Sequence, residues 1–310
     1  MAEKVVIIGS GPAGLSAAIY TAREGFNPLV IAGSVAGGQL ELTTEVENFP
    51  GFPEGVQGPE IIELMKKQAE RFGARLIYED VTDVDFSKRP FTLKAGGKSF
   101  ETDTVIVATG ANAKTLGLPE EKKFVGKGIS TCATCDAPFY KNKDVIVAGG
   151  GDTAMEDSNF LTNFAKSVTI VHRRDSFRAS KIMQERTLSN KKIKVVWDTT
   201  VEQILGNEKV TGAKLKNLKT NQITEVQIDG VFMAIGYSPN TTVFKGKLKL
   251  DELGYIVTRE EVLTDIEGVY VAGDVADRFY RQAITSSASG VKCALRVREY
   301  LANLHFSRKE

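Results

Sequence analysis

Two glycine-rich turns constrain the fold of this 310-residue chain more than any other feature. Each turn follows a short β-branched run and precedes a helical pattern: GSGPAG at residues 9–14 follows the run at 5–8, and GGGDTA at 149–154 follows the run at 145–148. Such runs are typical of strands buried in a parallel sheet. A strand, a GxGxxG or GxGxxA turn and a helix predict a dinucleotide-binding unit, because the glycines let the backbone approach a pyrophosphate at the helix N-terminus.

The two halves of the chain repeat one plan. VIVATG at residues 105–110 has a counterpart in VFMAIG at 231–236, at a comparable distance after its glycine turn. An apolar run at 268–274 and a helical pattern from about 284 to 304 have no counterpart in the second copy, so we assign them to the first. The sequence therefore predicts an α/β fold with two Rossmann-like dinucleotide-binding domains, the second inserted in the first. The predicted bounds are 1–114 with 242–310 for the outer domain and 115–241 for the inserted domain.

The inserted domain carries two of the three cysteines, Cys132 and Cys135, with two residues between them. This spacing is typical of a dithiol that forms and opens a disulfide and attacks other disulfides as a thiolate. A structural zinc site needs two more soft ligands, and the sequence offers only Cys293, His172 and His305, none in a second paired spacing. The pair therefore indicates redox chemistry, and we expect no metal.

Basic residues follow the second strand of the inserted domain, at the position where an NAD site usually has an acid. His172-Arg173-Arg174 comes directly after the apolar run at 168–171, and Arg178 follows nearby. Guanidinium groups at this position bind the 2′-phosphate that distinguishes NADPH from NADH. We therefore predict NADPH in the inserted domain; an ordinary basic surface turn is the alternative.

The outer domain has neither this arginine cluster nor the acid that usually binds a ribose hydroxyl. Its second predicted strand, at residues 28–31, ends in Ala32-Gly33-Ser34, so the motif does not assign the ribose contact. The GGQL loop at 37–40 could take over part of that contact. Two dinucleotide units beside a dithiol require a carrier that takes a hydride and passes electrons to sulfur, which a flavin does. We therefore predict FAD in the outer domain.

The composition narrows the classes of partner. A formal net charge of +1 argues against a nucleic-acid groove or a polybasic membrane surface. Three cysteines, an odd number, fit a reducing compartment better than a secreted disulfide framework. The sequence shows no signal-peptide pattern and no run long enough to span a bilayer. We expect a cytoplasmic protein that binds neither nucleic acid nor membrane.

In their order and spacing these motifs make the whole chain resemble the low-molecular-weight thioredoxin reductases. Further matching segments are GGQL at 37–40, EVEN at 45–48, ATG at 108–110, and Gly273-Asp274 with Arg281-Gln282-Ala283. The resemblance implies FAD in the outer domain, and NADPH and the dithiol in the inserted domain. It also implies a homodimer that uses thioredoxin as its electron acceptor.

The resemblance implies roles for individual residues as well. Cys135 would be the sulfur nearest to the flavin, Cys132 would attack thioredoxin, and Asp136 would be the general acid and base. Asp274 would hydrogen-bond the ribityl chain of FAD. The residues implied for FAD are Gly9, Gly11, Pro12, Ala13, Gly14, Gly38, Gln39, Leu40, Asn48, Ala108, Thr109, Gly110, Gly273, Asp274, Arg281, Gln282 and Ala283. The residues implied for NADPH are Gly149, Gly151, Asp152, Thr153, Ala154, His172, Arg173, Arg174 and Arg178.

One dipeptide departs from the family pattern. Ala137-Pro138 follows Asp136, where the family commonly has glycine and a bulkier segment, and Pro138 removes a backbone donor. The alternatives are therefore a reductase of another small disulfide carrier, glutaredoxin-like or peroxiredoxin-associated, and a non-catalytic flavin and dithiol redox sensor. A glutathione-reductase-type enzyme is disfavoured because residues 37–53 contain no cysteine. A thiol oxidase would not need the arginines after the second turn.

Overall fold

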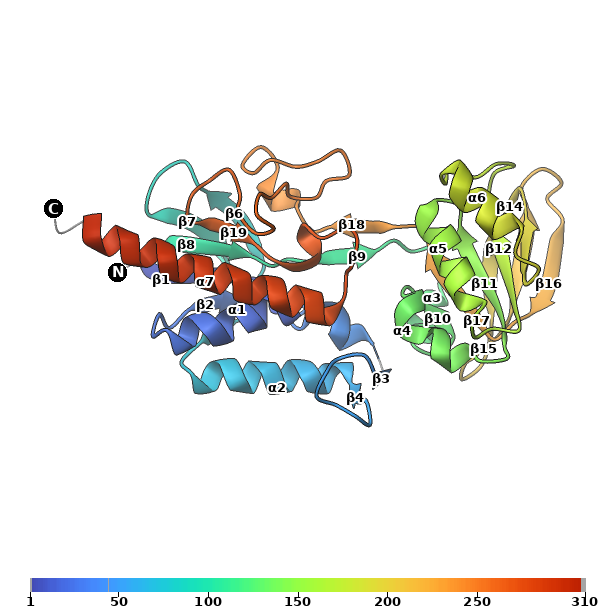
Figure 1. The fold of residues 1–310 in the computed structure, drawn as a ribbon, viewed down its shortest axis with the longest axis horizontal. Helices are drawn as coiled ribbons and strands as arrows, with labels where there is room; N and C mark the ends of the chain where they lie inside the picture. The colour runs from blue at the N-terminus through green and yellow to red at the C-terminus, as the bar shows by residue number, and fades with distance from the viewer. Residues whose placement is uncertain (1, 44, 308–310) are drawn as a thin grey trace. The chain divides into compact units, whose positions relative to one another are not determined.

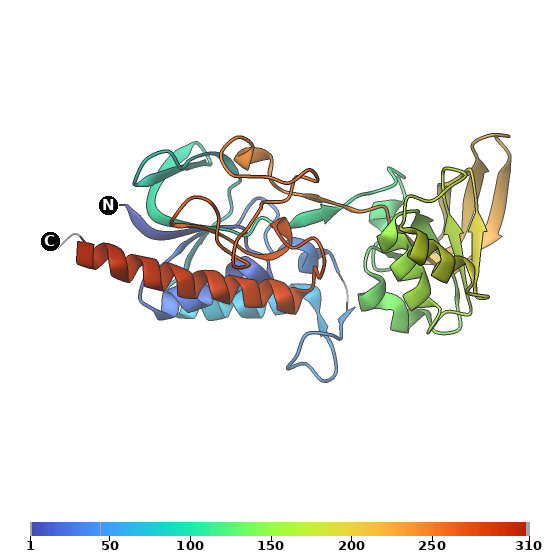
Figure 2. The same ribbon diagram turned by 45° about the horizontal axis from the view of Figure 1, so that its top comes forward.

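The computed structural model describes residues 2–43 and 45–307. The chain divides into two compact units, coloured by residue number in Figures 1 and 2. We call them the outer unit, Met1–Asn112 with Ser238–Glu310, and the inserted unit, Ala113–Tyr237.

The chain passes between the units after Asn112 and after Tyr237. The sequence places these two crossings after residues 114 and 241. Two short strands make the crossings and pair with each other: β9 (Ala111–Ala113) and β18 (Tyr237–Pro239).

The outer unit is built on a sheet whose central strands are parallel (Figure 1). The strand order is β5-β2-β1-β8-β7-β6, with β19 also paired to β8. Ile7 of β1 lies opposite Val30 of β2 and Ile106 of β8, and all three side chains are fully buried. The buried β-branched runs thus form parallel strands, as the sequence predicts. The strands are β1 (Glu3–Ile8), β2 (Leu29–Ile31), β5 (Arg75–Ile77), β6 (Val81–Asp85), β7 (Phe91–Ala95), β8 (Lys98–Val107) and β19 (Val269–Val271).

Helices α1 (Pro12–Arg23) and α7 (Ala283–Ser307) run side by side on one face of this sheet (Figures 1 and 2). They approach so closely that a Cβ on Gly290 of α7 would collide with the carbonyl of Ala13. Cys293 of α7 is part of the core of this unit, and burial raises the pKa of its thiol. The other elements of this unit are α2 (Gly58–Arg71), the 3-10 turns η1 (Gly38–Leu42), η3 (Thr242–Phe244) and η4 (Gly273–Val275), and the strands β3 (Glu45–Val46) and β4 (Val56–Gln57).

The inserted unit repeats the plan on a smaller parallel sheet with the order β10-β17-β11-β12-β13. The strands of an antiparallel sheet, β14-β15-β16, lie in the chain between β13 and β17. The strands are β10 (Ile129–Ser130), β11 (Asp144–Gly149), β12 (Ser167–Val171), β13 (Ile193–Val196), β14 (Thr199–Gly206), β15 (Val210–Asn217), β16 (Ile223–Gln227) and β17 (Gly230–Ala234). The helices are α3 (Glu121–Phe124), α4 (Ala133–Asp136), α5 (Asp152–Leu161) and α6 (Lys181–Leu188), with the 3-10 turn η2 (Ala137–Tyr140). The predicted fold class is confirmed: α/β, with two Rossmann-like domains, the second inserted in the first.

Two kinds of feature are missing from the described part of the chain. None of its helices is both long and apolar enough to cross a membrane. The same residues contain no group of three or more His, Cys, Asp and Glu side chains that could hold a metal ion.

Candidate active site

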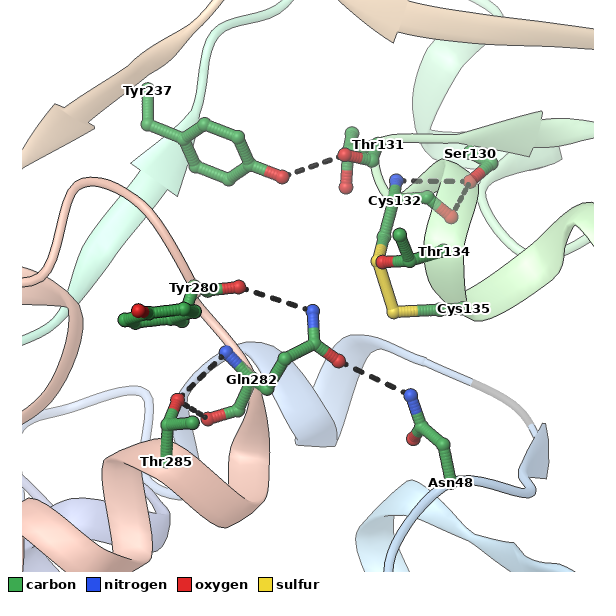
Figure 3. The surroundings of a disulfide bond; sticks show 10 residues. All are labelled: Asn48, Ser130, Thr131, Cys132, Thr134, Cys135, Tyr237, Tyr280, Gln282 and Thr285. Atoms are coloured by element: carbon green, nitrogen blue, oxygen red, sulfur yellow. Dashed lines mark hydrogen bonds between the residues drawn. A yellow bond between two sulfur atoms is a disulfide. The ribbon is translucent and has the colours of Figure 1, made fainter. Parts of the chain in front are cut away.

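Cys132 and Cys135 form a disulfide in the inserted unit, with their Cα atoms 5.3 Å apart (Figure 3). Cys132 is the N-cap residue of α4, and Cys135 lies in the single turn that follows. Both residues are partly exposed, while Ala133 between them is buried and anchors the turn in the core. The pair is therefore fixed to the unit but remains open to attack by an external sulfur.

The backbone before the disulfide is held by side chains that the sequence motif does not include. The Ser130 hydroxyl accepts a hydrogen bond from the Cys132 backbone N–H at 3.1 Å, and the Tyr237 hydroxyl donates to the Thr131 carbonyl at 2.6 Å (Figure 3). Thr134 Oγ1 lies 3.3 Å from Cys132 Sγ. A disulfide sulfur has no proton, so the Thr134 hydroxyl is the donor in this contact.

Asp136 follows Cys135 directly and is the titratable group nearest to the disulfide along the chain. Burial raises the pKa of its carboxyl, and a hydrogen bond with the Ser130 side chain opposes this shift in part. The Ser130 hydroxyl also lies 3.2 Å from the Cys132 carbonyl oxygen. Ser130 has a single proton to share between these two acceptors, so a protonated Asp136 can donate to its oxygen. The same buried surroundings raise the pKa of Tyr140 to about 12.

The second glycine turn leaves room for an anion at the start of α5. Its N-cap residue, Gly151, makes no side-chain capping bond to the backbone N–H groups of the first turn. A Cβ on Gly151 would meet no atom within 4 Å, whereas one on Gly149 would clash with Ala234 and Ala154. These residues therefore fit a pyrophosphate, which would occupy the open space at the helix N-terminus.

The arginine-bearing loop is folded back onto this glycine turn. Arg178 donates its backbone N–H to the Gly150 carbonyl at 2.8 Å, and Ser180 donates both its backbone N–H and its hydroxyl to Asp152 Oδ1, each at 2.9 Å. His172 is buried beneath the loop, and a Cβ on Gly150 would collide with its ring.

The side chains of Arg173, Arg174 and Arg178 are exposed, which suits contact with a phosphate. The His172 ring instead lies 3.1 Å from the Ser176 carbonyl, and burial lowers the pKa of its imidazole. This position favours His172 as a support for the loop; its contact with NADPH stays a prediction.

The first glycine turn has the same arrangement. Gly9 has a φ of +107°, and a Cβ there would collide with the Ala108 carbonyl, so only glycine fits. A Cβ on Gly14 would collide with the Gly9 carbonyl, whereas one on Gly11 would meet nothing closer than the Gly37 carbonyl, at 3.9 Å. Gly11 is the N-cap of α1 and makes no side-chain capping bond. This turn therefore also fits a pyrophosphate.

Other implied residues of the outer unit lie in hydrogen-bonded pairs. Asn48 donates to Gln282 Oε1 at 3.2 Å (Figure 3), and the Ser286 hydroxyl donates to Asp274 at 2.9 Å. Burial raises the pKa of Asp274 to about 6. Gln39 donates to Asn112 at 3.1 Å.

The sequence patterns miss several residues of these sites because single hydroxyls and acids carry no motif. Ser130 and Ser286 carry no motif, yet each bonds an acid named from the sequence. Asp80 bonds Ser34 at the end of β2, where the fingerprint lacks its acid. The signal that points to Asp80 is its position just after the carboxyl end of β5, the strand next to β2.

Comparisons with known proteins agree with this geometry. The family model described as pyridine nucleotide-disulphide oxidoreductase matches residues 3–290. The thioredoxin reductase of Rickettsia prowazekii is 51% identical over 303 residues, which cover 96% of this chain and 98% of the relative. That of Streptomyces coelicolor is 52% identical over 305 residues, covering 97% and 95%.

Solved structures give the same result. The thioredoxin reductase from Giardia duodenalis superposes with a TM-score of 0.92 at 40% identity, over 96% of this chain and 98% of that one. The enzyme from Streptococcus pyogenes superposes with a TM-score of 0.92 at 38% identity, over the same shares. The chain therefore belongs to the pyridine nucleotide-disulphide oxidoreductases and, within that family, to the thioredoxin reductases.

Proposed function

We propose that this chain transfers electrons from NADPH through FAD to the Cys132–Cys135 disulfide and on to thioredoxin. The observation that carries the proposal is the partly exposed disulfide next in the chain to a partly buried acid whose pKa is raised, in a chain with two dinucleotide folds. The names of the relatives support the choice of thioredoxin as acceptor.

We assign FAD to the outer unit and NADPH to the inserted unit. The turn at residues 9–14 would hold the FAD pyrophosphate, and Asp274 would accept from its ribityl chain. The turn at 149–154 would hold NADPH, with Arg173, Arg174 and Arg178 on its 2′-phosphate. When bound, NADPH would supply a hydride, and FAD would accept it and pass its two electrons to the disulfide.

The two cysteines of the chain then reduce thioredoxin by disulfide exchange. Two electrons and two protons convert the Cys132–Cys135 disulfide into a dithiol. The Cys132 thiolate attacks the thioredoxin disulfide, forming a mixed disulfide and releasing one thioredoxin thiolate. Cys135 attacks Cys132 Sγ, which frees the second thioredoxin sulfur and restores the internal disulfide. Each released thiolate takes up one proton.

Asp136 is the group placed to carry a proton to and from this site. Because burial raises the pKa of its carboxyl, it holds a proton at a higher pH than an exposed aspartate does. The Ser130 hydroxyl can donate to the Asp136 carboxylate and can accept from the protonated acid, so this contact suits both protonation states.

We also propose that the enzyme is a cytoplasmic homodimer that uses neither nucleic acid nor membrane as a partner. The support for the dimer is the family resemblance, and the support for the compartment is the odd cysteine count. The thioredoxin contact would include Phe139, which is 37% exposed next to the exposed Pro138. Light scattering of the purified protein tests the dimer.

The function is tested by NADPH-dependent reduction of a panel of oxidised proteins: thioredoxin, a glutaredoxin and a peroxiredoxin. We expect NADPH consumption with thioredoxin, and none when Cys132→Ser replaces the wild type. Faster reduction of the glutaredoxin or the peroxiredoxin would reassign the acceptor, and consumption that persists in Cys132→Ser would reject the dithiol route.

A further inference from the structure

The outer unit lacks the acid that dinucleotide folds usually place at the end of their second strand. Here β2 ends and is followed by Ala32, Gly33 and Ser34, none of which has a carboxylate. In the sheet, however, β5 lies parallel to β2 on its outer side. Parallel neighbours end at the same edge, so the residues after β5 reach the place where the acid is missing.

Hydrogen bonds fix the two strand ends side by side. Ala32 donates its backbone N–H to the Ile77 carbonyl at 2.8 Å, and Gly33 donates to the Glu79 carbonyl at 3.2 Å. Asp80 then accepts from the Ser34 backbone N–H with Oδ1 at 3.0 Å and from the Ser34 hydroxyl with Oδ2 at 2.7 Å. Its carboxylate therefore stands at the end of β2, although it comes from the neighbouring strand.

The carboxylate keeps capacity for a ligand. Each of its oxygens has about two acceptor directions, and the Ser34 bonds use one on each. The Ser34 hydroxyl gives its proton to Asp80, so its own oxygen is left as an acceptor. Both residues are exposed, and the bonds from Ser34 lower the pKa of Asp80, so the group is an anion at neutral pH. Adjacent acceptors of this kind suit the two neighbouring hydroxyls of a ribose.

The same strand end is bonded to the pyrophosphate turn. The buried Ser10 hydroxyl donates to the Ala32 carbonyl at 3.1 Å and accepts from the Gly37 backbone N–H at 3.0 Å. The ribose and pyrophosphate of one dinucleotide are directly linked, so their protein contacts must lie close together. The two hydrogen bonds of Ser10 hold the end of β2 close to the pyrophosphate turn.

We propose that Asp80, together with Ser34, binds the adenosine ribose of the dinucleotide held by the outer unit. Asp80, which follows β5, would take the role of the acid that is absent after β2. This inference rests on the proposal that FAD occupies the outer unit.

The test measures the dissociation constant of FAD by titrating flavin-free protein and following flavin fluorescence. Asp80→Asn keeps an acceptor for the Ser34 N–H but removes the charge and replaces the second acceptor oxygen by an NH2 donor. We therefore expect FAD to bind at least about 10-fold more weakly. Ser34→Ala should weaken binding by a smaller factor. Glu79→Gln removes the adjacent exposed acid and is the matched control, with binding within about 2-fold of wild type.

A second titration uses FAD analogues that lack the 2′- or the 3′-hydroxyl of the adenosine ribose. Wild type should bind at least one analogue more weakly than FAD, and Asp80→Asn should bind FAD and that analogue equally. Unchanged FAD binding in Asp80→Asn, an equal loss in Glu79→Gln, or a hydroxyl penalty that persists in Asp80→Asn would overturn the inference. Wild-type protein that binds no FAD would instead overturn the assignment of FAD to the outer unit.

Discussion

Asp136 is the residue whose chemistry depends most on its surroundings. Asp136→Asn keeps the size and polarity of the side chain but cannot exchange a proton. We expect thioredoxin-dependent turnover to fall by about 10-fold or more, with FAD content unchanged. Steady-state kinetics and the flavin absorbance of the purified variant measure the two effects. Turnover equal to wild type would leave Asp136 with a structural role only.

Asp274 gives a pH dependence in the flavin-free protein. Burial raises its pKa to about 6, above the value of about 4 in the unfolded chain, so the folded state binds this proton more tightly. Its contribution to stability is complete below about pH 4 and is lost as the pH rises through 6. Asp274→Asn should remove this loss and stabilise the flavin-free protein at pH 7.5 by about 2 kcal/mol. Urea unfolding at pH 5 and 7.5 measures the free energy of unfolding of both proteins. A change of this free energy with pH that is the same in variant and wild type would contradict the prediction.

Gly11 and Gly151 allow the two nucleotide assignments to be tested separately. The folded chain has space for a Cβ at both positions, and neither has a positive φ. A methyl group there should obstruct only the phosphate. We expect Gly11→Ala to weaken FAD binding by at least about 10-fold, and Gly151→Ala to raise the KM for NADPH similarly while retaining FAD.

The unfolding temperature of each flavin-free glycine variant is the control for folding. The opposite pattern, with FAD lost in Gly151→Ala and a raised KM for NADPH in Gly11→Ala, would interchange the two assignments.

At the scale of single residues, the sequence predicts those features that depend on residues adjacent in the chain. The glycine turns and the cysteine pair are short motifs whose geometry is set by adjacent residues. Ser130, Ser286 and Asp80 cannot be recognised in the same way, because hydroxyls and acids are common on surfaces. Only the folded chain brings Asp80 to Ser34.

At the scale of elements, hydrogen bonds between Ser180 and Asp152 help to hold the loop from His172 to Ser180. Ser180→Ala removes one of the two bonds to Asp152 and should loosen the arginines. We expect the KM for NADPH to rise about 3-fold and the KM for NADH to stay unchanged, because only NADPH has the 2′-phosphate.

Ser176→Ala is the matched control for this loop, since that hydroxyl contacts only Asp175 among the hydrogen bonds described. An equal rise of KM for both nucleotides, or the same effect in Ser176→Ala, would show that Ser180 does not act through the arginines.

Elements with a continuous apolar run or a clear helical period are predictable from the sequence, and strands with mixed exposure are not. The strand expected at residues 5–8 is Glu3–Ile8, and the helix expected from about 284 to 304 is Ala283–Ser307. Continuous apolar runs and helical periodicity mark such elements clearly. The hairpin of β6 and β7 and the sheet β14-β15-β16 have mixed, partly exposed strands, and the sequence patterns do not identify them.

At the scale of the whole molecule, the repeated fingerprint and the long C-terminal helix indicate the insertion of one domain in another. The electron acceptor cannot be predicted from such patterns, because its choice depends on the surface of a second protein. Ala137 is fully buried and Pro138 exposed, so the departure from the family pattern is partly in the core and partly on that surface.

The central claim is that one chain stores electrons both on a flavin and on the Cys132–Cys135 pair. Anaerobic titration with NADPH, followed by flavin absorbance and thiol content, tests it most directly. The account predicts that wild-type protein takes up two equivalents per chain, one for each centre, and that oxidised thioredoxin restores the yellow colour. The double variant Cys132→Ser, Cys135→Ser should take up one equivalent and stay bleached with thioredoxin. A colourless wild-type protein, or equal uptake by both proteins, would contradict the account.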